Sequence, residues 1–292
     1  AVRGGDLLDE PIAAFIGYLA EHSDRQLLEI GQTRHLLVFD FGGGTCDVAI
    51  FRLSTDLSGK LMVSSLSVSR YNRLGGGDID QAILYGVVLP QILEQNGLDR
   101  HALDYNTKKT MIEPAFISVA EQLKTGLCEK LAGLGEQKDW PADLEETCHR
   151  KFSLTLNDGR EITLVNPTLN LKTFNEILAP FLNENMLFVR ETEYYQTLSI
   201  FVPILDALHR SDLKEDQIDL FLMAGGSCLI PHVKPKLHAS FKNAEMLSFA
   251  TADAMQTAVA RGAALNALSL ALSERPVIQP VCQESIAIVT GN

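Results

Sequence analysis

The sequence predicts an α/β fold. Short apolar runs of strand length alternate along the chain with longer stretches that repeat apolar residues at helical spacing. Glycine turns follow or interrupt three of these regions, at His35–Leu53, Leu74–Asp80 and Leu220–Pro231. With 292 residues, the chain can form one large or two modest domains with a proper core.

The expected elements of the first half begin with a helix near Pro11–Glu21. Three strands follow, at Leu36–Phe41, Val48–Leu53 and Leu61–Ser69. We expect Asp78 to be the N-cap of the next helix, and Pro90 to kink or end that helix. A further helix is expected to begin at Pro114, because proline is favoured in the first helical turn.

In the second half, Asn157-Asp158-Gly159 is a strong hairpin signal between the strand-like runs Phe152–Leu156 and Ile162–Leu164. Helical patterns resume at Leu171–Val189 and Tyr194–Leu208. A strand at Leu220–Ala224 and helices near Ile230 and Ala252 complete the expected order.

The glycine turn between the first two strands is the most informative motif. Its residues Gly42, Gly43, Gly44 and Thr45 expose backbone N–H groups, and glycine lets a phosphate approach the backbone closely. Asp40 ends the first strand and Asp47 follows the turn, so both are placed to hold Mg²⁺ or its waters beside that phosphate. Taken alone, the motif also fits a glycine-rich hairpin with two solvated carboxylates.

A second turn of this kind follows the strand at Leu220–Ala224. Gly225, Gly226 and Ser227 precede another helical pattern. A helix N-terminus after such a turn favours an anion, because unpaired N–H groups and the helix dipole point toward it.

The order of these motifs resembles the nucleotide-binding domain of the DnaK-type, seventy-kilodalton heat-shock chaperones (the heat shock protein 70 family), within the actin-like ATPase superfamily. The resemblance rests on DEPIAAFIGY at Asp9–Tyr18, DFGGGTCD at Asp40–Asp47, LGGGDID at Leu74–Asp80, AGGSCLIP at Ala224–Pro231 and ATADAMQTAVARGAA at Ala250–Ala264. The resemblance implies an actin-like ATPase (ribonuclease H-like) lobe with an inserted α+β subdomain.

The resemblance also implies a domain organisation. Residues 1–34 would carry a connecting helix from a missing first lobe, and residues 35–78 and 210–275 would form the core of the second lobe. Residues 79–209 would be the inserted subdomain, and residues 276–292 a linker toward a missing C-terminal domain. The family's first phosphate hairpin and its lysine that aids hydrolysis do not precede Ala1. We therefore expect no appreciable ATP hydrolysis by this chain alone.

The resemblance further implies roles toward ATP or ADP and Mg²⁺. Asp40 would orient Mg²⁺-bound water, Thr45 would donate its hydroxyl to the γ-phosphate, and Glu10 would lie near the metal and the attacking water. The residues expected to bind the nucleotide are Gly42, Gly43, Gly44, Thr45, Gly76, Glu121, Lys124, Cys128, Gly225, Gly226, Ser227 and Asp253. Metal contact is expected at Asp40, through water.

Structural alternatives stand beside these roles. Glu121 and Lys124 also fit an ordinary solvated i,i+3 pair. Glu10 also fits a first-turn helix acid, and Asp253 fits the N-cap of the last helix.

Two positions depart from the family's pattern. Thr125 and Leu229 stand where the resemblance places arginines that clamp the adenine. Guanidinium stacking on a ring contributes ~1–2 kcal/mol when partly desolvated, so we expect weaker nucleotide binding unless Leu229 supplies apolar contact.

Two functions follow from this comparison. One is the ATP-binding lobe of a DnaK-like molecular chaperone, which couples ATP binding and hydrolysis to peptide binding in the full-length protein. The alternative is a non-hydrolysing actin-fold adaptor or scaffold with a degenerate nucleotide site. The intact DFGGGTCD motif favours the first function, and the two missing arginines favour the second.

The amino-acid composition of the chain narrows the kinds of molecule that it is expected to bind. The chain has 25 basic and 37 acidic residues, and its net charge of −12 disfavours nonspecific binding to nucleic acid or anionic membranes. Its five cysteines are odd in number and have no CxxC spacing, which favours reduced thiols in a cytoplasmic protein. Ala254–Leu272 carries polar residues and fits a core helix better than a membrane span. Expected partners are the missing lobe and substrate-binding domain of the same protein, with co-chaperones or an exchange factor as candidates.

Overall fold

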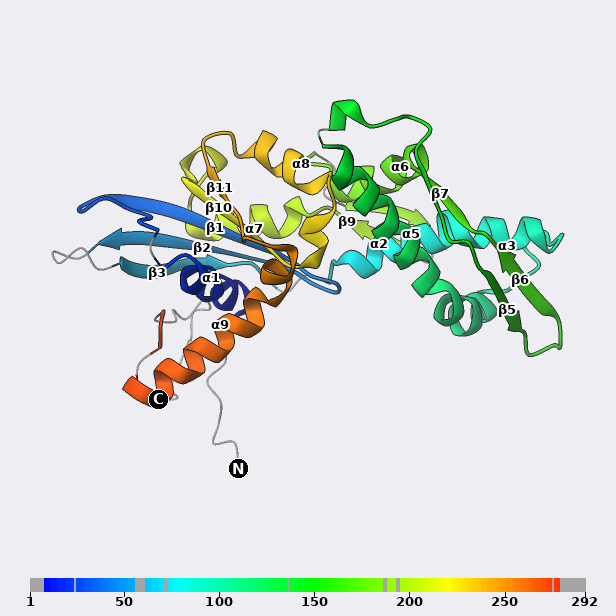
Figure 1. The fold of residues 1–292 in the computed structure, drawn as a ribbon, viewed down its shortest axis with the longest axis horizontal. Coiled ribbons are helices and arrows are strands. Elements are labelled where there is room, and N and C mark those ends of the chain that lie inside the picture. The colour runs from blue at the N-terminus through cyan, green and yellow to red at the C-terminus, as the bar shows by residue number, and fades with distance from the viewer. Residues whose placement is uncertain are drawn as a thin grey trace, which may run out of the picture. The chain divides into compact units, whose positions relative to one another are not determined.

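The computed structural model describes residues 8–23, 25–55, 61–70, 73–135, 137–185, 188–192, 195–274 and 276–278, with the backbone alone for 188–192 and 195–198. The chain divides into two compact units, each described here by itself (Figure 1). Unit 1 comprises Ala1–Arg73, Phe201–Cys228 and Lys234–Asn292, and unit 2 comprises Leu74–Ile200 and Leu229–Val233.

A five-stranded mixed sheet organises unit 1, in the order β11-β10-β1-β2-β3 (Figure 1). Its strands are β1 (Thr33–Phe41), β2 (Cys46–Thr55), β3 (Leu61–Val68), β10 (Leu220–Ala224) and β11 (Glu245–Leu247). Strand β1 is parallel to β10 and antiparallel to β2. The turn between β1 and β2 and the turn after β10 therefore lie at the same end of the sheet.

Side chains alternate between the two faces of this sheet along each strand. Both faces are buried, because other elements of unit 1 pack against each of them. On one face, Leu36 and Val38 join a core with helices α1 (Glu10–Glu21) and α9 (Ala252–Ser273). On the other face, the Phe221 ring lies 6.2 Å from that of Phe39, centroid to centroid, and 4.9 Å from that of Phe241. Helix α7 (Phe201–Ser211) packs on β2 and β3, and α8 (Val233–Ser240) precedes β11.

Helices α1 and α9 cross at very short range. A Cβ atom on Gly262 would lie 1.7 Å from the carbonyl oxygen of Ala13, and one on Gly17 would lie 2.4 Å from that of Ala258. Two backbones therefore touch where side chains would normally separate them. This crossing requires glycine on both helices.

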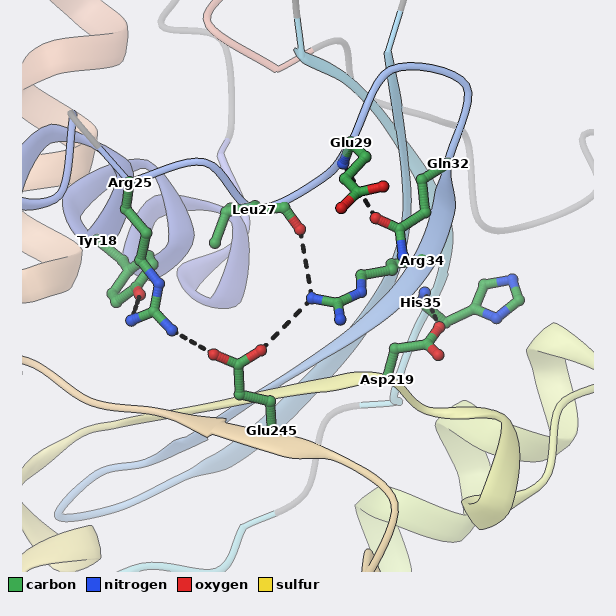
Figure 2. Close-up of polar contacts among 9 residues, drawn as sticks. All are labelled: Tyr18, Arg25, Leu27, Glu29, Gln32, Arg34, His35, Asp219 and Glu245. Atoms are coloured by element: carbon green, nitrogen blue, oxygen red, sulfur yellow. Dashed lines mark hydrogen bonds and ion pairs between the residues drawn. The ribbon is translucent and has the colours of Figure 1, made fainter.

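Glu245 ties the segment after α1 to the edge of the sheet (Figure 2). Its carboxylate forms an ion pair with Arg25 and a longer one, 3.4 Å, with Arg34. Arg25 also donates to the Tyr18 hydroxyl at 3.0 Å, and Arg34 donates to the carbonyl of Leu27 at 3.4 Å. Because these charges are partly exposed, each pair contributes only ~0–1 kcal/mol. The network fixes the path of the segment more than it stabilises the unit.

Unit 2 combines helices with two-stranded antiparallel sheets. Its helices are α2 (Gly76–Ile83), α3 (Leu89–Gln95), α4 (Tyr105–Thr107), α5 (Glu113–Leu134) and α6 (Leu171–Phe181). Its strand pairs are β4 (Glu145–Thr147) with β7 (Thr168–Asn170), β5 (Lys151–Thr155) with β6 (Glu161–Val165), and β8 (Phe188–Thr192) with β9 (Tyr195–Leu198). π-helical turns at Leu84–Val88 and Lys108–Ile112 join α2 to α3 and α4 to α5.

The structure confirms the predicted first helix, first three strands, hairpin at Asn157-Asp158-Gly159, strand at Leu220–Ala224 and helix at Pro114. The predicted helices Leu171–Val189 and Tyr194–Leu208 are wrong at the ends that adjoin each other in the chain, namely the C-terminal end of the first and the N-terminal end of the second. There, β8 and β9 pair antiparallel. This segment is rich in β-branched and aromatic residues, which favour strands once a partner strand is available.

The predicted N-cap of α2 is also wrong. The N-cap of α2 is Gly75, and Asp78 lies three residues further on, where its carboxylate accepts from the Gly75 N–H at 2.7 Å. Pro90 does not end the helical run, because it lies in the first turn of α3, directly after a π-helical turn. A missing N–H costs little in a first turn. The alternative of a kink at Pro90 stays a prediction.

Helix α9 covers the segment predicted as a core helix, and it packs against α1. Within the described ranges, no helix has the length and apolar character needed to cross a bilayer. The expected linker lies mostly outside the described residues.

Candidate functional site

The Gly42–Thr45 turn presents open backbone. The N–H of Gly42 donates to the carbonyl of Thr45 at 3.0 Å, which closes the turn. Gly43 and Gly44 are exposed, and a Cβ on either would meet no described atom within 4 Å. Neither has a left-handed φ. The fold therefore gives no reason for glycine at these two positions, whereas a group bound against the backbone would.

The turn after β10 packs directly on the end of β1. Gly225 has a φ of 84°, and a Cβ there would lie 2.4 Å from the carbonyl oxygen of Phe41 and 2.6 Å from Oδ1 of Asp40. The Ser227 hydroxyl donates to the carbonyl of Gly42 at 2.8 Å. The structure thus brings together the two turns that sequence motifs single out. The Ser227 hydroxyl joins them, and a 3-10 turn begins at Gly226.

Beside these turns, the charges of two other carboxylates act on the carboxylate of Asp40. Burial, followed by the charges of Glu10 and Asp47, raises the pKa of Asp40 to about 7. Burial also raises the pKa of Asp47, and a hydrogen bond from Thr45 opposes that rise. No described side chain forms an ion pair or hydrogen bond with the carboxylate of Asp40. A divalent cation would relieve this repulsion and lower the pKa of Asp40, so the carboxylates fit Mg²⁺.

Direct coordination by several side chains does not fit. Within the described ranges, no three His, Cys, Asp or Glu side chains come close enough to bind one metal ion. The water-mediated metal contact expected at Asp40 stays a prediction.

Glu10 and Asp253 occupy helix starts. Glu10 is exposed in the first turn of α1, and its charge still reaches Asp40. Asp253 is exposed in the first turn of α9 but is not the N-cap. The N-cap is Thr251, whose hydroxyl accepts from the N–H of Ala254 at 3.1 Å. The alternative of Asp253 as an N-cap is therefore wrong.

The cysteine thiols next to these turns stay protonated near pH 7 and are therefore poor nucleophiles. Cys46 and Cys228 are buried, and burial raises the pKa of both. The thiol of Cys228 lies 2.9 Å from the carbonyl of Ala224, to which it donates. The four described cysteines, at positions 46, 128, 148 and 228, are free thiols. Cys282 lies outside the described residues.

In unit 2, Lys124 on α5 is held by Asp80 on α2. The Lys124 ammonium lies 2.8 Å from Oδ1 and 2.9 Å from Oδ2 of Asp80, and it donates to the carbonyl of Gly76 at 3.2 Å. The two side chains are only 13% and 8% exposed. Lys124 therefore does not form the solvated pair with Glu121 that was the alternative. Glu121 itself is exposed.

Asp80 is the partner of Lys124, which the sequence analysis did not predict. Burial raises its pKa, and Lys124 opposes that rise. Cys128 lies in the same surroundings, where burial raises the pKa of its thiol to about 12. Asp80 belongs to the LGGGDID motif, but the sequence gives no signal that it faces Lys124, because 44 residues separate them.

Replacing Lys124 with methionine should lower the free energy of unfolding by about 2–3 kcal/mol. The change leaves the Asp80 carboxylate buried without a counter-charge, and proton uptake by Asp80 offsets part of that cost. Urea denaturation measures the loss, with the exposed Lys172→Met as a matched control. Adding Asp80→Asn should recover most of it. A loss below about 0.5 kcal/mol would show that the pair does not stabilise the fold.

Comparison with known proteins identifies a family that part of the chain resembles. Residues 6–134 match the family model described as "Hsp70 protein". The chaperone protein DnaK of Picrophilus torridus is 26% identical over 275 residues, which are 93% of this chain and 36% of that protein. A chaperone protein HscA homolog of Methylobacillus flagellatus is 27% identical over 265 residues, 91% of this chain and 32% of that protein.

The fold is a mixed α/β arrangement that agrees with a lobe of an Hsp70 nucleotide-binding domain. The chain is similar to the Hsp70/DnaK family, in line with the resemblance that its sequence motifs indicate. It spans about a third of the length of the curated relatives it matches. The family match includes the segments at Asp9–Tyr18, Asp40–Asp47 and Leu74–Asp80 and ends before Ala224.

Proposed function

We propose that this chain is the ATP-binding lobe of a DnaK-like chaperone, which couples ATP binding and hydrolysis to peptide binding in the full-length protein. One observation carries the proposal. Gly43 and Gly44 leave backbone exposed at the end of the sheet, although the surrounding structure has room for a side chain at both positions. A phosphate bound against the turn explains both glycines.

The chain's own residues would act mainly by position. The N–H groups of the Gly42–Thr45 turn would bind phosphate oxygens, and the Thr45 hydroxyl would donate to the γ-phosphate. Asp40 would hold a water bound to Mg²⁺, with Glu10 close to the attacking water. Mg²⁺ would supply positive charge for the phosphates when it is bound. Phosphoryl transfer needs little else from a protein besides positioning and charge stabilisation.

The nucleotide's other contacts would come from the remaining predicted residues. Gly225, Gly226 and Asp253 lie in unit 1, whereas Gly76, Glu121, Lys124 and Cys128 lie in unit 2. Because Lys124 is buried against Asp80, it would hold α5 to α2 in addition to contacting the nucleotide. The proposed domain organisation keeps residues 79–209 as an inserted subdomain of the second lobe.

The second candidate function is a scaffold that keeps the fold without hydrolysing nucleotide. Thr125 is exposed on α5, and Leu229 is 38% exposed after the second glycine turn. Neither side chain can clamp an aromatic ring as an arginine would. A scaffold needs no phosphate turn, so the state of that turn separates the two functions.

Replacing Gly44 with alanine should weaken MgATP binding by about tenfold or more, because the new methyl group lies where a phosphate would approach. The midpoint of thermal unfolding should stay unchanged, since the Cβ meets open space. Calorimetry on the full-length protein that carries this chain measures the affinity. Gly133→Ala, at another open position, is the matched control. Unchanged MgATP affinity in Gly44→Ala, or none in the wild type, would favour the scaffold.

A further inference from the structure

Side-chain amides of α3 cover one edge of the β5–β6 hairpin, which lies beside that helix in unit 2 (Figure 1). Each of three amides donates its N–H to the carbonyl of a strand residue and accepts the backbone N–H of the same residue. The pairs, with donor–acceptor distances between 2.6 and 3.0 Å, are Asn96 with Thr163, Gln95 with Val165 and Gln91 with Thr168. These amides satisfy the edge of β6 and the start of β7 as a neighbouring strand would.

The opposite edge of the hairpin, along β5, is open. In an antiparallel pair, directly opposed residues either exchange hydrogen bonds or both point their backbone groups outward. The backbone groups of Thr163 and Val165 point toward α3. Their partners Ser153 and Lys151 therefore point outward on the other side, and Thr155 follows by alternation. In the part of the chain that the structure describes, no third strand pairs with β5, and no other group bonds to these outer atoms.

The side chains of β5 alternate between a polar and an apolar face. The exposed polar members are Lys151, Ser153 and Thr155. On the other face, Phe152 and Leu154 are only half-buried, whereas their partners Leu164 and Ile162 on β6 are buried. The apolar face of the hairpin thus ends in two partly covered side chains at the open edge. A further strand would cover both.

The start of β5 is positively charged. His149, Arg150 and Lys151 follow one another in a chain whose net charge is −12. Neither Arg150 nor Lys151 forms an ion pair with a described side chain, whereas the nearby Arg160 is paired with Asp158. Unpaired basic residues would repel the same edge of a second copy of this chain and attract an acidic partner.

We propose that β5 binds an extended polypeptide segment that alternates acidic with apolar residues and adds a third strand to the hairpin. Its backbone would pair with the outer groups of Lys151, Ser153 and Thr155. Because opposed residues share one face of a sheet, its acidic side chains would lie beside Lys151 and its apolar ones beside Phe152 and Leu154. This surface lies within unit 2 and includes none of the residues proposed to bind the nucleotide, so the inference does not depend on the proposed function.

The test uses the full-length protein that carries this chain and a synthetic heptapeptide of alternating valine and glutamate with blocked ends. Ser153→Pro should weaken binding of this peptide by about tenfold or more, because proline removes the outward N–H but no hydrogen bond to β6. Ser153→Ala is the matched control, since it keeps that N–H, and it should bind within about twofold of the wild type. Titration calorimetry measures the affinities, and thermal unfolding shows whether either variant disturbs the fold.

Charge reversal at Lys151 gives a second test that needs no proline and decides the matter if Ser153→Pro fails to fold. Lys151→Glu should weaken binding of the glutamate peptide by about fivefold and strengthen binding of a peptide in which lysine replaces glutamate. If the wild type does not bind the glutamate peptide, Lys151 only guards the edge against pairing, and the proposal is wrong. Binding that neither Ser153→Pro nor Lys151→Glu changes lies elsewhere on the protein and also overturns it.

Discussion

Replacing Gly262 with alanine should lower the free energy of unfolding of unit 1 by about 3–5 kcal/mol. The added Cβ would lie 1.7 Å from the carbonyl oxygen of Ala13 and 2.6 Å from its carbon. Both contacts are with backbone, which cannot rotate away as a side chain can. Helix α9 would have to move away from α1, and the packing between the two helices would be lost along their length.

Urea denaturation at pH 7 measures this effect. Gly133→Ala makes the same chemical change within α5, where a Cβ meets open space, and helix propensity should stabilise that variant by about 0.5–1 kcal/mol. Gly17→Ala should behave like Gly262→Ala, because it fails at the same crossing. If Gly262→Ala loses less than 1 kcal/mol, the helices do not cross as closely as the structure shows.

This crossing also shows a limit of sequence reasoning. Ala250–Ala264 is correctly predicted as a helix, yet Gly262 within it looks only like a weak helix former. Its reason lies in α1, about 250 residues away in the chain. The Lys124–Asp80 pair was missed in the same way, since helical spacing suggests Glu121 as the partner. In both cases, the residue that explains the observed structure lies far away in the sequence.

The Gly42–Thr45 turn, by contrast, could be predicted from the sequence because its geometry is local. Two apolar strands separated by Gly42–Thr45 can only pair antiparallel around a tight turn. The parallel pairing of β10 with β1 then places Gly225 beside that turn. The predictions that failed, such as the inner ends of the helices around β8 and β9, lie where pattern alone favours two structures and a partner strand decides between them.

Replacing Asp40 with asparagine should stabilise the fold at pH 8 by up to about 4 kcal/mol. In the wild type the native carboxyl keeps its proton up to about pH 7, whereas an unfolded chain releases it near 3.8. Between these pH values the native state binds more protons than the unfolded state. The free energy of unfolding of the wild type therefore falls as the pH rises through this window. Asparagine carries no charge, so the variant avoids that loss.

Urea denaturation of both proteins at several pH values between 4 and 8 tests the argument. The two stabilities should agree near pH 4 and diverge as the pH approaches 7, while the exposed Asp143→Asn should follow the wild type throughout. Equal stabilities at pH 8 would show that the charge of Asp40 is well solvated.

The gain in stability should accompany a loss of function. In the full-length protein, Asp40→Asn should lower ATP hydrolysis by about a hundredfold or more, because an amide does not offer Mg²⁺-bound water the charge of a carboxylate. A carboxylate that destabilises its own fold is expected where a cation binds, since the cation relieves the repulsion only when it arrives. If the Asp40→Asn variant gains stability and also keeps its hydrolysis rate, the buried charge of Asp40 is not needed for catalysis. The proposed function would then not explain why a carboxylate stands at this position.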